Sequence, residues 1–254
     1  MNGSSRSIAI KKNIIASLFL KGISILVSLQ VVPLTINYIN PTRYGIWLTL
    51  SSIVAWLSYF DLGFAHGFRN RFAEAVAKGD MQLAREYVST TYVVLSLLFS
   101  SVFLIAIVVN HFVDWSAILN VDAAYSSELN IVFGILAFFF CLNIVASIFT
   151  TMLTANQKPA LASLIQTLGQ VFGFICIYIL TKTVPGNLDV LAFAFSGVPC
   201  FLLIIISIGM FLSGRYRHLS PSFHFVHFSL TKKIVGLGGQ FFIIMISMLF
   251  VFQL

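Results

Sequence analysis

The sequence predicts an all-α fold: a polytopic bundle of transmembrane helices. Hydrophobic residues make up 59% of the 254 residues, charged residues make up only 9%, and the mean hydropathy is +0.97. In an ordinary soluble domain about a quarter of all residues are charged, so the composition indicates an integral membrane protein. Apolar runs of about 20 residues, long enough to cross roughly 30 Å of hydrocarbon, recur along the chain. The segments between them are too short for a soluble domain.

We expect about seven membrane helices. They cover residues 13–36, 44–65, 88–110, 129–154, 160–181, 188–213 and 236–254. The first run is too long and too polar for a cleaved signal peptide, so it is expected to remain as a helix. Trp47, near the start of the second run, is expected in an interfacial aromatic belt.

Basic residues orient these helices. Twelve of the fifteen fall on one side: Arg6, Lys11, Lys12, Arg69, Arg71, Lys78, Arg85, Lys158, Arg215, Arg217, Lys232 and Lys233. The opposite side holds Arg43 and Lys182. Basic residues beside a span mark the cytoplasmic side, which places the N-terminus in the cytoplasm. Because these residues are spread over several loops, the net charge of +7 reflects topology, and no nucleic-acid partner is expected.

The first helix has a polar face. Its members recur at helical spacing: Ser17, Lys21, Ser24, Ser28 and Thr35. This face is expected to contact protein or water, because polar groups in a membrane helix avoid lipid.

An ionisable residue within a span usually faces a cavity or a charged partner. At 1.5 Å per residue, Lys21 lies about 13 Å deeper than Lys12. Asp61 lies about 12 Å from Arg69, at a matching depth. We therefore expect a Lys21–Asp61 pair that lines a cytoplasm-facing cavity; the alternative is that both side chains snorkel separately to the interface. His66 is expected to tune the charge of this cavity and not to bind a metal.

The charged segment after the second run predicts an amphipathic helix on the inner membrane surface, with Phe72 and Val76 on its apolar side. Asp80 is expected to cap the helix that follows. At the mouth of the bundle, Arg69 and Arg71 are candidates for contact with anionic headgroups of membrane lipids or with a phosphorylated lipid substrate.

Polar residues also occur in later runs. In the fifth run, the residues that share a face are Ser163, Gln166, Gln170 and Gly173. Their polar groups are candidates for hydrogen bonds to sugar hydroxyls or, equally, to neighbouring helices, and Asn143 in the fourth run has the same two interpretations. Gly169 and Gly173 predict close helix packing, and Pro199 predicts a kink.

No soluble segment contains a nucleophile–base set, a Gly-rich phosphate loop or paired acids, so the sequence predicts neither an enzyme nor a cofactor. Three histidines in one loop lack nearby carboxylates or cysteines, and no metal site is expected: His218, His224 and His227. The cysteines lie in apolar runs without metal-ligand spacing and are expected to pack as small apolar residues: Cys141, Cys176 and Cys200.

A resemblance to a known family begins at Tyr38. It comprises YINPTRYGIWLTLSSIVAWLSYFDLGFAHGFRNRFAEAVAKGD, followed by AREYVSTTY. This stretch resembles the N-terminal part of bacterial polysaccharide flippases, the O-antigen (Wzx-like) transporters of the multidrug/oligosaccharidyl-lipid/polysaccharide exporter superfamily. The resemblance implies alternating-access transport of undecaprenyl-diphosphate-linked oligosaccharide across the bacterial cytoplasmic (inner) membrane, as in lipopolysaccharide biosynthesis.

Family members have about twice as many helices, arranged in two lobes. The resemblance therefore divides this chain into a six-helix N-terminal lobe over 1–213, a cytoplasmic inter-lobe loop over 214–235 and the start of a second lobe over 236–254. The chain is expected to be an N-terminal fragment, or a half that associates with a second lobe or with glycan-assembly proteins. Two alternatives stay open: a cation-coupled multidrug exporter with Asp61 as its ion site, and a non-transporting membrane scaffold.

Overall fold

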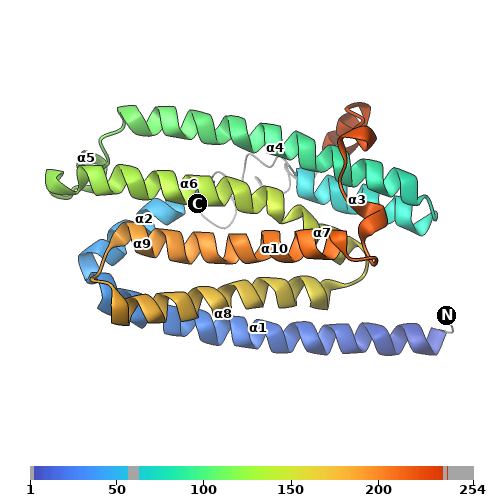
Figure 1. The fold of residues 1–254 in the computed structure, drawn as a ribbon, viewed down its shortest axis with the longest axis horizontal. Coiled ribbons are helices and arrows are strands. Elements are labelled where there is room, and N and C mark those ends of the chain that lie inside the picture. The colour runs from blue at the N-terminus through green and yellow to red at the C-terminus, as the bar shows by residue number, and fades with distance from the viewer. Residues whose placement is uncertain (1–2, 57–62, 237–238, 240–254) are drawn as a thin grey trace.

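The computed structural model describes residues 3–56, 63–236 and 239. Every regular element in this part of the chain is a helix, which confirms the predicted all-α class (Figure 1). The α-helices are α1 (Gly3–Ile39), α2 (Pro41–Ala55), α3 (Phe64–Ala77), α4 (Met81–Phe112), α5 (Trp115–Leu119), α6 (Ser126–Ala146), α7 (Ile148–Ala155), α8 (Pro159–Thr183), α9 (Leu188–Ala192) and α10 (Val198–Leu212). A π-helical turn, η3 (Phe193–Gly197), joins the last two. Short 3-10 turns are η2 (Ala123–Tyr125), η4 (Arg217–Leu219) and η5 (Phe223–Phe225).

Five stretches are long and apolar enough to cross a membrane: Asn13–Ile39, Met81–Phe112, Ala123–Ala155, Pro159–Thr183 and Leu188–Leu212. The chain is thus a multi-pass helical membrane protein. These stretches coincide with five of the seven expected runs. The second expected run begins as α2, and residues 57–62 lie outside the described residues. So does the seventh run, apart from Gly236 and Gly239.

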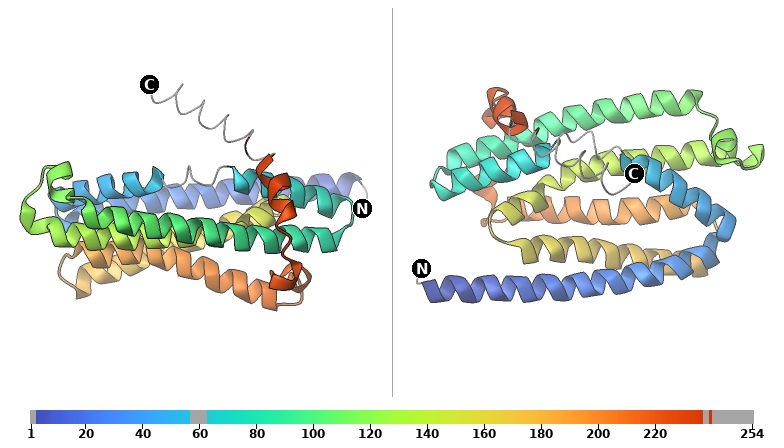
Figure 2. Two further views of the ribbon diagram at one scale, coloured as in Figure 1. Left: turned by 90° about the horizontal axis from the view of Figure 1, so that it is seen from above. Right: turned by 180° about the vertical axis from the view of Figure 1, so that it is seen from behind.

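The connections gather at two ends of the bundle (Figure 1). Residues 78–80, 156–158 and 213–236 lie at one end, which we call the basic end. The turn at Asn40, residues 113–125 and residues 184–187 lie at the other, which we call the Arg43 end. This grouping is the one that the sequence predicts for the two sides of the membrane. Figure 2 shows the segment after α10 crossing the basic end toward α3 and α4.

Polar side chains set the helix boundaries. Asn40 accepts a hydrogen bond of 3.0 Å from the backbone N–H of Arg43, and Pro41 occupies the first turn of α2. Asp80 accepts from the N–H of Leu83 at 2.9 Å and starts α4, as expected. Gly79, with φ of 77°, supplies the left-handed residue after α3.

Helices α1 and α8 run parallel, side by side. Asn13 donates to the carbonyl of Gln157, and Tyr38 donates to the carbonyl of Pro185. Between these contacts, Ser24 donates to the side chain of Gln170. The polar face predicted for α1 therefore contacts protein at this position.

The apolar face of α3 is buried. Phe64, Phe68, Phe72 and Ala75 are each at most 5% exposed, and α3 packs against α4 and α7. The predicted amphipathic helix is present, but the prediction that its apolar side lies on the membrane surface was wrong. Its apolar side covers the protein core instead of the membrane surface.

Candidate ligand cavity

A cavity of about 660 Å³ lies between α1, α2, α6, α8 and the η3–α10 segment. This volume falls within the roughly 300–1,000 Å³ that small-ligand sites occupy. Its wall contains side chains from segments far apart in sequence, which only the packed bundle brings together. The aromatic members are Tyr44, Trp47, Phe139, Phe140, Phe174 and Phe195.

Trp47 is the centre of the aromatic wall. Its ring meets the ring of Phe195 edge to face, with centroids 4.5 Å apart at 74°, and stacks near Tyr44 at 6.3 Å. Such pairs hold aromatic rings in fixed orientations. Trp47 is 5% exposed, so the expected place in a lipid-facing belt was wrong; the residue packs inside the bundle.

The polar members of the wall are uncharged: Ser28, Ser51, Ser52, Asn143, Gln170 and Ser196. Three of the hydroxyls, those of Ser28, Ser52 and Ser196, donate to carbonyls one turn earlier in their own helices. Those donors are consequently used within the protein. No described residue that lines the cavity carries a charge.

Two amides remain available. Asn143 is exposed, and its side chain has no hydrogen-bond partner within the described ranges. Gln170 accepts from Ser24 through Oε1, while its Nε2 donors have no acceptor among the described residues. In the cavity wall, the indole N–H of Trp47 and the hydroxyl of Ser51 are buried and likewise unpaired in that part of the chain.

The η3 turn shapes one side of the cavity. A π-helical turn is an insertion into an α-helix and often occurs at functional sites. Here it places Phe195 and Ser196 in the wall. The ring of Phe139 lies so close to Gly197 that a Cβ would approach it to 2.9 Å, so a larger residue at this position would displace the ring.

The predicted glycine pair of α8 provides the facing surface. A Cβ at Gly169 would lie 3.2 Å from Pro199, and one at Gly173 would lie 3.5 Å from it. The predicted close packing is therefore present, with α10 as its partner. The two glycines let Pro199 sit directly against α8.

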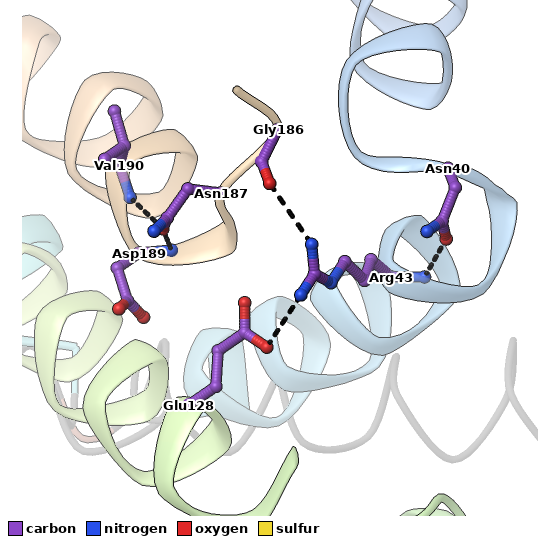
Figure 3. A network of polar contacts seen from close by, with 7 residues as sticks. All are labelled: Asn40, Arg43, Glu128, Gly186, Asn187, Asp189 and Val190. Carbon is purple, nitrogen blue, oxygen red and sulfur yellow. Dashed lines mark hydrogen bonds and ion pairs between the residues drawn. The ribbon is translucent and has the colours of Figure 1, made fainter. Parts of the chain in front are cut away.

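Arg43 contacts several segments at the Arg43 end of the bundle (Figure 3). Its guanidinium donates to the carbonyl of Gly186 at 3.1 Å and pairs with Glu128 at 3.4 Å. The guanidinium also lies 5.6 Å from the ring centre of Tyr125. One side chain from α2 thus holds both α6 and the α8–α9 connection.

The start of α9 completes this network. Asn187 caps the helix by accepting from the N–H groups of Asp189 and Val190, at 2.8 and 3.2 Å (Figure 3). Asp189 Oδ1 is buried and makes no hydrogen bond to any described residue.

Comparisons with family models, curated proteins and solved structures found no match. The cavity and its surroundings are therefore interpreted from this chain alone.

Among the expected site residues, Gln170 lines the cavity, and Gln166 and Lys21 do not. Gln166 and Lys21 are both exposed. They lie at a similar level, because Thr167 donates to the carbonyl of Leu20 in the parallel helix pair. Both therefore flank the cavity toward the basic end.

The remaining candidates lie elsewhere. His66 and Arg69 are exposed on α3. Arg71 pairs with Glu74 at 3.0 Å and donates to the carbonyl of Lys233 at 3.4 Å. Asp61 lies outside the described residues, so the Lys21–Asp61 pair stays a prediction.

Proposed function

We propose that the chain is the N-terminal lobe of a flippase that moves undecaprenyl-diphosphate-linked oligosaccharide across the bacterial cytoplasmic membrane. The observation that supports it best is the exposure of Asn143 and Gln170 to a cavity inside apolar helices. Unpaired polar groups at membrane depth cost several kcal/mol unless water or a polar ligand satisfies them. A transport path for a polar group explains both amides.

The basic end supports the anionic part of this substrate. Arg69, Lys232 and Lys233 are exposed there, and basic clusters at the cytoplasmic face attract anionic headgroups. In this proposal the N-terminus is cytoplasmic, 1–213 forms the lobe, 214–235 is the inter-lobe loop and 236–254 begins the second lobe. A second lobe or glycan-assembly proteins are its partners.

The lining residues favour this function over export of cationic drugs. A cation in a membrane cavity requires a counter-charge, and no acidic side chain lines the described part of the cavity. An exporter that used Asp61 for coupling would share the same architecture, so transport measurements separate the two.

The test is deletion of the gene in its host and restoration with the full chain. We expect deletion to remove surface polysaccharide and to accumulate lipid-linked oligosaccharide in the cytoplasmic leaflet. The restored gene should reverse both effects. Normal glycan export in the deletion strain would favour the scaffold role, and increased retention of ethidium would favour the drug exporter.

A further inference from the structure

We propose that the cavity beside Trp47 binds a neutral sugar ring. The inference rests on the proposed function for the source of the sugar, namely the glycan of the lipid-linked substrate. It assigns the sugar, and not the diphosphate, to this cavity.

Charge excludes the diphosphate. None of the described lining side chains is basic, and Lys21 and Arg69 lie outside the lining. A diphosphate buried here would lose its hydration without gaining a charged partner, which is strongly unfavourable. The anionic group is better placed at the basic end.

The aromatic wall fits a sugar ring. Trp47, Phe195 and Phe174 come from three different segments and present aromatic surface to one cavity. The electron-rich face of an aromatic ring attracts the weakly positive C–H groups on one side of a pyranose. The edge-to-face contact of Trp47 with Phe195 holds this surface in place without a ligand.

The amides fit hydroxyl groups. An amide side chain offers two donors and an acceptor, so it can satisfy the donor and the acceptor of neighbouring sugar hydroxyls at once. Asn143 on α6 and Gln170 on α8 lie on separate walls of the cavity. The bond from Ser24 orients Gln170 in advance, which lowers the entropy cost of binding.

Other occupants fit less well. A lipid tail would leave both amides unpaired, at a cost comparable to that of lost hydrogen bonds. A neutral, hydroxyl-rich ring satisfies the aromatic and the polar lining together.

The test is saturation-transfer NMR of the full chain in lipid nanodiscs. The probes are the methyl glycosides of glucose, galactose and N-acetylglucosamine, with protein-free nanodiscs as the blank. We expect saturation to pass from the protein to the ring C–H protons of at least one glycoside. Asn143→Leu should weaken binding about fivefold, the equivalent of one lost hydrogen bond.

Gln30→Leu is the matched control, because Gln30 is an exposed amide of α1 outside the lining. This variant should bind as the wild type does. Asn143 has no hydrogen bond to any described residue, so Asn143→Leu should fold normally, and a thermal melt checks this. Equal binding by both variants, or displacement of the glycoside by tetraphenylphosphonium, would overturn the inference.

The outcomes separate this site from the proposed function. Glycoside binding in a chain whose deletion leaves glycan export normal would remove the flippase and keep the sugar site. Export that depends on the chain, without specific glycoside binding, would remove the sugar site and keep the flippase.

Discussion

Arg43 donates a hydrogen bond of 3.1 Å to the carbonyl oxygen of Gly186, 143 residues further along the chain. A Cβ at Gly186 would overlap the carbonyl oxygen of Tyr38, so the α8–α9 connection passes α1 more closely than a residue with a side chain would allow. The ion pair with Glu128 adds α6 to the same contact. This one position therefore closes the Arg43 end around the cavity helices.

Arg43→Met should lower the free energy of unfolding by about 2 kcal/mol, since a half-buried charged hydrogen bond is lost and Glu128 keeps no partner among the described residues. The measurement is a thermal melt in detergent. Arg215→Met is the control, because Arg215 is exposed at the basic end. Equal melting temperatures for the two variants would contradict the role of Arg43.

Gly169→Leu should destabilise the bundle by about 1–3 kcal/mol through overpacking against Pro199. Gly209→Leu is the matched control, because a Cβ at this helical glycine meets no atom within 4 Å. The control should melt at or slightly above the wild-type temperature, since leucine favours a helix over glycine. Similar losses in both variants would mean that the α8–α10 contact is not the cause.

Much of the fold could be predicted because apolar run length and loop chemistry act locally. The third apolar run, expected from residue 88, forms the later part of α4, which starts at Met81 with the cap that the sequence predicts at Asp80. The fourth is divided at Ser147 into α6 and α7, although the run is predominantly apolar. Local patterns do not encode such a break.

The cavity was harder to predict, because it depends on how helices rotate against one another. Gln170 could be singled out from its face on α8, and Asn143 from its polarity. Neither pattern shows that the two amides share a space with Trp47. The last residue of the η3 turn, Gly197, packs against Phe139, a tertiary contact between distant segments.

Asp114 provides a pH-dependent cap at the start of α5. Hydrogen bonds from the hydroxyl of Ser116 and the backbone N–H of Ala117 hold the pKa of the Asp114 carboxyl below its ordinary value. A lowered folded-state pKa stabilises the fold above the unfolded-state pKa, near 4, and this contribution is lost as the pH falls through the folded value. The stability advantage of wild type over Asp114→Asn should therefore be present at pH 7 and shrink below pH about 4. A difference in melting temperature that stays constant with pH would contradict this.

Arg85 anchors the segment after α10. It donates to the carbonyl of Ser220 at 2.9 Å and lies 4.2 Å from the ring centre of Phe225. Arg85→Met should release the segment and speed trypsin cleavage after Arg217 several-fold. Arg69→Met, which removes an exposed cation of α3, should not change the cleavage rate. A rate that rises equally in both variants would indicate a general loss of packing.

Lys21 and Arg69 test the proposed path of the diphosphate. Lys21 flanks the cavity and Arg69 lies on α3, so each offers an exposed cation to the anionic group outside the neutral lining. Lys21→Ala and Arg69→Ala should each reduce translocation of lipid-linked oligosaccharide about tenfold, because a charge-assisted hydrogen bond is lost. The measurement is surface glycan in the complemented deletion strain, with membrane levels of each variant checked by immunoblot. Lys182→Ala, at the opposite end, controls for the loss of one positive charge and should export normally. Wild-type export in both variants would mean that neither cation meets the substrate.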